Sequence, residues 1–133
     1  FRMKRALDNG EFELYYQPVL DMAQGRFIGA EALIRWNCPD EGLIPPFKFI
    51  PAAEESGLII PLGDWIIEEG FRQSAEWNKG RSQNNALTIN LNVSPRQFAE
   101  SDLIALVNKC QSKSGDAVIK FEVTEYALMN NPD

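Results

Sequence analysis

The chain has 133 residues, 44% of them hydrophobic, which is enough for one packed domain at most. Its formal net charge of −6 argues against a broad basic surface for DNA, and no apolar run approaches the roughly 20 residues that cross a bilayer. The sequence contains no histidine, which excludes histidine-based acid–base chemistry and the usual zinc ligand sets within it. We therefore expect no DNA binding and no membrane contact by this segment.

Helical and strand patterns alternate along the chain after two initial strands. The longest predicted helix carries Ile67, Phe71 and Ala75 at fourfold spacing as its buried stripe, and Ser101 is expected to cap a later helix. The predicted elements are a helix at 1–9, strands at 11–20 and 26–36, a loop at 37–46, helices at 47–56 and 61–79, a strand at 86–94, one helical turn at 95–98, a helix at 102–112, a strand at 117–125 and a final helix from about Tyr126.

The strand at 26–36 places a carboxylate and a guanidinium on the same face. Side chains of a strand alternate between faces, so Glu31, Leu33 and Arg35 share one face while Ala32 and Trp36 share the other. At about 3.3 Å per residue, Glu31 and Arg35 stand on the order of 13 Å apart, too far to neutralise each other directly. A carboxylate fixed there needs another cation, and a metal ion is the natural candidate.

Two later strands repeat this pattern of an aliphatic back and an oxygen-rich front. One such strand is commonplace, but three separated by helical stretches indicate parallel strands whose polar faces converge on one cavity. The sequence thus predicts an α/β barrel or an open α/β sheet. The polar faces hold Asn90, Asn92 and Ser94 in the strand at 86–94, and Lys120, Glu122 and Thr124 in the strand at 117–125.

The cysteines and glycines further limit the kinds of binding site that the sequence predicts. Cys38 and Cys110 lie in unlike contexts without a metal-binding spacing, so we expect reduced thiols in a cytoplasmic protein; a lone disulfide is the alternative. The chain has neither a Walker-type loop nor Gly-x-Gly-x-x-Gly, the usual signatures of phosphate-binding loops. The negative charge still permits a phosphate ligand, because bound divalent cations reverse the local sign.

A series of short motifs runs along almost the whole chain. The motifs are Tyr16-Gln17-Pro18, Glu31-Ala32-Leu33-Ile34-Arg35-Trp36, Phe49-Ile50-Pro51 with Ala53-Glu54, Gly57-Leu58-Ile59, Leu62-Gly63 with Trp65, Asn92-Val93-Ser94 with Gln97-Phe98, and Glu122-Val123-Thr124-Glu125. A lone Glu-Ala-Leu carries no signal. In this order and at these intervals, the motifs resemble the first half of an EAL domain, a bacterial phosphodiesterase module.

The resemblance implies a TIM-like (β/α) barrel whose first strand runs antiparallel to the rest, truncated here to roughly its first half. Residues 1–10 would then end an upstream linker helix, and residues 11–133 would form the N-terminal half of the domain. The parent protein would be a metal-dependent phosphodiesterase that hydrolyses cyclic di-GMP to linear pGpG in the regulation of biofilm and motility. Implied partners are cyclic di-GMP, a second copy of the domain and an upstream GGDEF or sensor domain.

The resemblance also implies roles for single residues. Mg²⁺ and Mn²⁺ prefer oxygen ligands, and two such ions activate water and stabilise the leaving oxygen of a phosphodiester. Glu31 and Glu122 count as catalytic as well as metal-binding. The implied roles are metal ligation by Glu31, Asn92 and Glu122, phosphate contact by Arg35, nucleotide contact by Gln17 and Leu33, and support of a catalytic loop by Glu125.

Plainer interpretations stay open for several of these residues. Asn92 at a strand end is also compatible with a cap, Arg35 with a surface ion pair and Gln17 with simple solvation. Glu54 and Glu55 are expected to be solvated or locally paired acids at a helix end, and Trp65 and Trp77 to be core residues.

The length of the chain separates it from a complete domain of this family. A TIM barrel takes typically ~250 residues. The family's Asp-Asp pair, catalytic lysine, and later glutamate and glutamine are missing, so we expect the isolated chain to be inactive. The alternative for the parent protein is a catalytically inactive EAL domain that acts as a cyclic di-GMP receptor or an interaction module.

Overall fold

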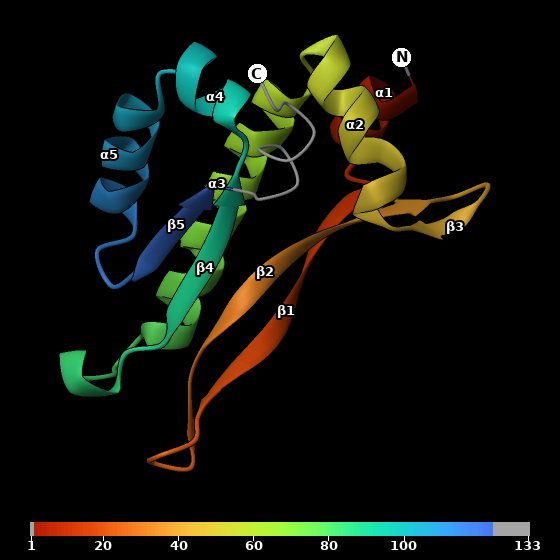
Figure 1. Ribbon diagram of the computed structural model, residues 1–133. Coiled ribbons are helices and arrows are strands. Elements are labelled where there is room, and N and C mark those ends of the chain that lie inside the picture. The colour runs from red at the N-terminus through yellow and green to blue at the C-terminus, as the bar shows by residue number, and fades with distance from the viewer. Residues whose placement is uncertain (1, 124–133) are drawn as a thin grey trace.

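The chain folds into a five-stranded mixed sheet with helices packed against it (Figure 1). The computed structural model describes residues 2–123. Its elements are α1 Arg2–Asp8, β1 Phe12–Asp21, β2 Arg26–Cys38, β3 Gly42–Ile44, α2 Pro46–Ser56, α3 Ile59–Asn78, a 3-10 turn Gln83–Asn85, β4 Thr88–Val93, α4 Pro95–Glu100, α5 Leu103–Lys113 and β5 Ile119–Val123.

The strand order is β1-β2-β4-β5, with the short β3 paired to β2. β1 runs antiparallel to β2, whereas β2, β4 and β5 are mutually parallel. Parallel strands need crossover connections, which are provided here by α2 with α3 and by α4 with α5. The predicted succession of two strands followed by helix–strand units is confirmed, including the reversed first strand.

β2 forms ladders of very different lengths with β1 and with β4. With β1 it forms ten residue pairs, from Phe12↔Trp36 to Asp21↔Arg26, interrupted by one irregularity after Val19. With β4 it forms three pairs, from Gly29↔Thr88 to Glu31↔Asn90. Figure 1 shows the consequence: β1 and β2 stay together, whereas β2 and β4 separate towards their C-terminal ends.

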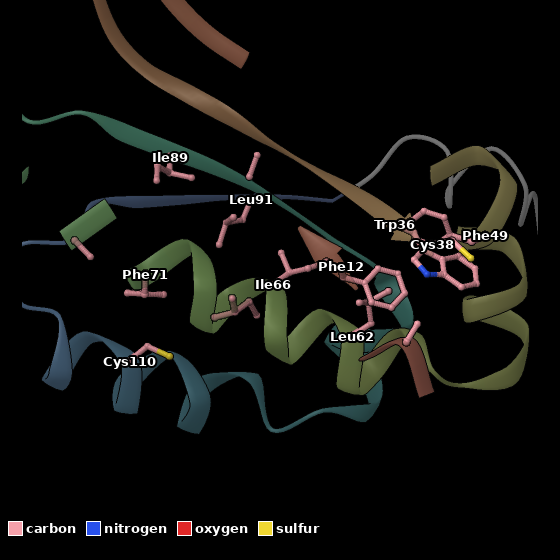
Figure 2. Packing of buried hydrophobic residues seen from close by; sticks show 14 residues of the cluster. Phe12, Trp36, Cys38, Phe49, Leu62, Ile66, Phe71, Ile89, Leu91 and Cys110 are labelled. Carbon is pink, nitrogen blue, oxygen red and sulfur yellow. The ribbon is translucent and has the colours of Figure 1, made fainter. Parts of the chain in front are cut away.

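The hydrophobic core lies between the back of the sheet and α3 (Figure 2). Leu62 and Phe71 of α3 and Ile89 and Leu91 of β4 are at most 2% exposed. The predicted stripe on α3 is confirmed, because Ile67 and Phe71 are buried and Ala75 packs against the cluster. The predicted core residues Trp65 and Trp77 also pack there.

Two buried polar side chains of α3 hold the ends of the parallel strands. Asn78 is 3% exposed; its Nδ2 donates to the carbonyl of Leu87 at 2.9 Å and its Oδ1 accepts from the amide of Leu87 at 2.7 Å. The hydroxyl of Ser74 accepts from the amide of Val118 at 2.8 Å and donates to its carbonyl at 3.3 Å. These contacts pair the amide and carbonyl of Leu87 and the amide of Val118, just before β4 and β5; the carbonyl of Val118 also accepts from the amide of Ile89 at 3.0 Å.

The N-terminal helix packs onto the same core. Ala6 of α1 is 1% exposed and belongs to the central cluster. Arg2 donates to the sulfur of Cys38 at 2.9 Å, pairs with Glu41 at 2.8 Å and lies 6.0 Å from the ring centroid of Trp36. Cys38 and Cys110 are both free and buried, so the alternative of a disulfide between them is wrong. The division of the chain at residue 10 stays a prediction.

The predicted loop at 37–46 contains structure that its composition hides. β2 continues to Cys38 and turns back through β3, because Gly42 adopts φ +76 and closes a short hairpin with the pair Cys38↔Gly42. α3 begins at Ile59 rather than at 61, since Pro61 is tolerated in the first helical turn, where amides lack helical partners.

The predicted cap of α5 is wrong by one residue. Asp102, not Ser101, precedes the helix and accepts from the amide of Ala105 at 3.3 Å. The hydroxyl of Ser101 instead donates to Asp64 of α3 at 3.2 Å. Within residues 2–123, none of the helices is long and apolar enough to span a membrane.

Candidate functional site

The polar face of β2 is the foundation of the candidate site. Ala30, Ala32 and Trp36 are 4–6% exposed on the helix-covered side of the sheet. Strand alternation therefore places Glu31 and Arg35 on the opposite side, as predicted. Both side chains are partly buried.

The structure brings Glu31 and Asn92 into direct contact. Nδ2 of Asn92 donates to Oε2 of Glu31 at 3.2 Å. Glu31 is in register with Asn90, so Asn92 lies on the same face, two residues further towards the C-terminal end of β4. A carboxylate and an amide that are 61 positions apart in the sequence thus meet where β2 and β4 begin to separate.

Glu122 joins this face from the third parallel strand. It is in register with Asn92, and in-register residues of adjacent strands point to the same side of a sheet about 4.8 Å apart. Its side chain is exposed, whereas Ile89 and Leu91 on the back of β4 are fully buried. The three predicted metal ligands therefore share one face and come from consecutive strands.

Gln17 and Arg35 flank this group on the β1–β2 side. Gln17 is directly opposite Glu31 in the antiparallel register and is exposed. Arg35 donates through Nη1 to the carbonyl of Ile34 at 2.8 Å, and its guanidinium lies 5.7 Å from the ring centroid of Tyr15. Within the described part of the chain Arg35 has no carboxylate within 4.0 Å, so the surface ion pair considered for it is not formed there.

A cavity of about 300 Å³ opens beside Asn92, at the place where β2 and β4 part. Leu33 and Asn92 lie in its wall, and Phe47 and Ile50 of α2 close another side. This volume is at the lower end of the range of small-ligand pockets, and its lining is mostly apolar with a few polar groups, as is typical of such pockets. The cavity places apolar surface directly next to the polar contact of Glu31 with Asn92.

The sequence model of the EAL domain matches residues 2–133. This chain belongs to the EAL domain family. Cyclic di-GMP phosphodiesterase PdeR of Escherichia coli is 39% identical over 133 residues, which cover 98% of this chain and 20% of PdeR. Signaling protein YkoW of Bacillus subtilis is 41% identical over 132 residues, which cover 97% of this chain and 16% of YkoW. The chain therefore spans a fifth or less of the length of these two relatives.

Solved EAL domains share the fold described above. The structure of the PaMucR phosphodiesterase in its c-di-GMP complex has a TM-score of 0.83 and is 35% identical; the match covers 98% of this chain and 53% of that one. The FimX EAL domain from Pseudomonas aeruginosa, bound to c-di-GMP, has a TM-score of 0.77 at 20% identity, covering 96% and 50%, and shows the likeness of fold alone. The expected TIM-barrel-like α/β fold, present here over about half of those chains, is confirmed.

Two groups of residues beside the cavity of this EAL domain were not predicted. Glu54, expected to be a solvated acid at a helix end, is partly buried and lines the cavity, whereas Glu55 is exposed as expected. Arg96 donates to the carbonyl oxygen of Glu54 and bonds Glu100 through Nε at 2.6 Å. It thereby ties α4 to the C-terminal end of α2, whose partial negative charge suits a guanidinium.

Gln97 and Gly63 fix α4 against α3 on the other side of the cavity. Gln97 is 2% exposed, and its Nε2 donates to Oδ1 of Asp64 at 3.2 Å. A Cβ added at Gly63 would collide with the side-chain amide of Gln97, so the absence of a side chain at residue 63 makes this close approach possible. Only two features of the sequence indicated this contact: the motif Leu62-Gly63, and Gln97 in the motif that begins at Asn92.

Glu125 and the helix expected from Tyr126 lie outside the described residues. Between residues 2 and 123, no group of three or more Asp, Glu, Cys or His side chains is arranged to hold a metal ion. The face described above offers two carboxylates and one amide instead. All three provide oxygen donors, which is the chemistry that Mg²⁺ and Mn²⁺ prefer, so these residues fit a hard cation.

Proposed function

We propose that the protein carrying this chain hydrolyses cyclic di-GMP to linear pGpG with bound Mg²⁺ or Mn²⁺. The observation that supports this most directly is the contact of Asn92 with Glu31, with Glu122 in register beside them. Oxygen donors from three neighbouring parallel strands at one end of a sheet are suited to a metal-assisted phosphodiester reaction.

In this proposal Glu31, Asn92 and Glu122 hold the metal. The amide of Asn92 now turns its NH₂ towards Glu31, and a rotation of the amide plane by about 180° presents its oxygen to a cation instead. Bound divalent cations supply an activated water and neutralise charge on the scissile phosphate. No arginine or lysine of the described residues lies within 4.0 Å of either carboxylate, so no ion pair competes with a cation there.

Arg35, Gln17 and Leu33 position the dinucleotide. The carbonyl of Ile34 and the ring of Tyr15 already orient the guanidinium of Arg35, which leaves further N–H groups to bind a phosphate in its planar fork. Leu33 borders the cavity of about 300 Å³, where an apolar wall suits a guanine base. Gln17, exposed and opposite Glu31, offers an amide to the same ligand.

The remaining parts of the proposal concern the parent protein. Glu125 supports a catalytic loop, and a second EAL domain and an upstream GGDEF or sensor domain are partners. The protein acts in the cytoplasm, in agreement with two free buried thiols, and regulates biofilm formation and motility.

The test uses the full-length protein incubated with cyclic di-GMP and Mg²⁺ or Mn²⁺, with chromatography of the products. We expect linear pGpG, its loss in EDTA, and a decrease in kcat of at least about 100-fold for Glu31→Gln, which removes a charged ligand. Glu68→Gln, at an exposed position of α3, also removes one negative charge and should leave the rate unchanged.

The same experiment separates the alternative function. Binding of cyclic di-GMP without any cleavage in either metal would identify a receptor and refute the phosphodiesterase. The isolated 133-residue chain should release no pGpG above a metal-only control, because three ligands do not position two ions.

A further inference from the structure

Two arginines meet at the turn before β4, far from the Glu31 face. Arg26, at the start of β2, donates to Oδ1 of Asn85 at 3.0 Å and to the carbonyl of Asn84 at 3.3 Å. Arg81 donates to the carbonyl of the same Asn85 at 3.3 Å and to that of Trp77 at 3.1 Å. Neutral oxygens thus hold both guanidinium groups beside one residue, at the end of the molecule where the β1–β2 turn lies (Figure 1).

Neither guanidinium is neutralised by a carboxylate. Among residues 2–123, no acidic oxygen lies within 4.0 Å of Arg26 or Arg81. Asp21 is in register with Arg26, but its carboxylate accepts from the amides of Ala23 at 2.9 Å and Gln24 at 3.3 Å. Two positive charges without partners in a chain of net charge −6 form a local site for an anion.

Both arginines line a cavity of about 390 Å³ whose walls contain no acidic residue. A second cavity, of about 310 Å³, adjoins it, because Phe27, Arg81 and Leu87 belong to both. Aromatic side chains dominate the second cavity: Phe27 is 62% exposed, and Tyr16 and Trp77 meet edge-on with ring centroids 4.8 Å apart. We call the two together the Arg26–Arg81 cavity.

The aromatic part of the cavity offers ring surface, and the hydroxyl of Tyr16 is not exposed in it. The hydroxyl of Tyr16 is buried and has no hydrogen-bond partner within the described chain, although buried polar groups are nearly always paired. Tyr16 therefore gives the cavity ring surface, while its hydroxyl stays closed to solvent. The guanidinium groups that suit an anion and an aromatic surface thus lie in adjoining spaces.

We propose that the Arg26–Arg81 cavity binds a nucleoside phosphate. The phosphate pairs with the two guanidinium groups, and the base packs against Phe27 and Trp77. This site is distinct from the face that carries Glu31, because Tyr16 and Gln17 are consecutive residues of β1 and point to opposite sides of the sheet.

The test is calorimetric titration of the full-length protein in EDTA with GMP, guanosine and ribose 5-phosphate. GMP should bind at least about tenfold more tightly than either partial ligand, because only GMP fills both parts of the cavity. Arg26→Gln and Arg81→Gln should each weaken GMP binding by about tenfold or more. Lys109→Gln is the control of equal charge and should bind as the unchanged protein does.

Three outcomes would overturn the proposal. Equal affinity of Arg26→Gln, Arg81→Gln and Lys109→Gln for GMP would remove the anion site. Loss of GMP binding in Glu31→Gln with retention in both arginine variants would place the nucleotide on the opposite face. A structure of the full-length protein in which another segment of protein bonds the hydroxyl of Tyr16 and fills the cavity would also overturn the proposal.

Discussion

The two ladders of β2 offer an instructive comparison. On one side β2 and β1 form ten antiparallel pairs and are joined by a short turn, so the two paired strands are consecutive in the sequence. On the other side β2 and β4 form three parallel pairs, with two helices intervening in the chain. Parallel pairing of distant segments requires the closure of a long loop before it gains stability, whereas a hairpin does not.

The difference lies in what holds each ladder together. The hairpin depends on its own backbone bonds and cross-strand side chains. The parallel half depends on close contacts made by small and buried polar residues, namely Gly29 against Thr88, Gly70 against Leu91, and Ser74 and Asn78 against the strand ends. The β2–β4 ladder ends at the pair Glu31↔Asn90, and the candidate site and its cavity lie at that position.

The largest effect is expected from Gly29→Ala. A Cβ at this position would collide with the backbone carbonyl oxygen of Thr88, which cannot move without breaking the β2–β4 ladder. We expect the free energy of unfolding in urea to fall by at least about 3 kcal/mol. Gly115→Ala is the matched control, since nothing lies within 4 Å of its added Cβ. Equal stability of the two variants would show that the parallel ladder is not tightly packed.

Asn78→Ala should have the next largest effect. It leaves the amide and carbonyl of Leu87 without the partners they have now, at 2.7 and 2.9 Å. Because these backbone groups lose their partners, the free energy of unfolding of Asn78→Ala should be about 2 kcal/mol lower than that of the unchanged protein, as measured by chemical denaturation. Asn108→Ala on the exposed face of α5 should change it by less than about 0.5 kcal/mol. A similarly small change for Asn78→Ala would contradict a stabilising role for its contact with the backbone of Leu87 before β4.

The smallest expected effect concerns the contact of the hairpin with α3. Burial raises the pKa of the Tyr16 hydroxyl to about 12, Glu69 adds to the increase, and Arg72 opposes it. The ordinary pKa is about 10, so the unfolded chain loses this proton first, and stability present below pH 10 is lost between pH 10 and 12. After allowance for partial exposure, the loss is about 1 kcal/mol.

Comparison with Tyr16→Phe isolates this contribution from other groups that titrate in alkali. Urea unfolding at pH 9 and pH 11.5 should show a larger decrease for the unchanged protein than for the variant. Identical decreases would mean that the hydroxyl is solvated in the folded state and that the back of the hairpin does not pack closely on α3.

Alternation of apolar and polar residues predicted most of the sheet and the grouping of Glu31, Asn92 and Glu122, because the face of a strand is a local property. β3 was missed because it has only three residues, and its hairpin depends on the left-handed conformation of Gly42. Ser101 was predicted as a cap because serine suits that position, but its hydroxyl contacts Asp64 and Asp102 caps the helix instead.

The parts of the site that depend on register could not be predicted in the same way. The position of Tyr15 beneath Arg35 follows from the pairing of β1 with β2, and the cavity follows from the point at which β2 leaves β4. The inward position of Glu54 depends on the packing of α2, which its acidic sequence at a helix end does not reveal. Contacts between distant segments determine all three.

The attachment of α1 has a mechanical consequence. Arg2 donates a hydrogen bond to Cys38, pairs with Glu41 and lies over Trp36, all near the end of β2, while Ala6 is buried in the core. Arg2 therefore connects α1 to the C-terminal end of β2, in addition to the direct chain connection from α1 to β1. Since Trp36 directly follows Arg35, the position of α1 is coupled to the strand end that carries this guanidinium.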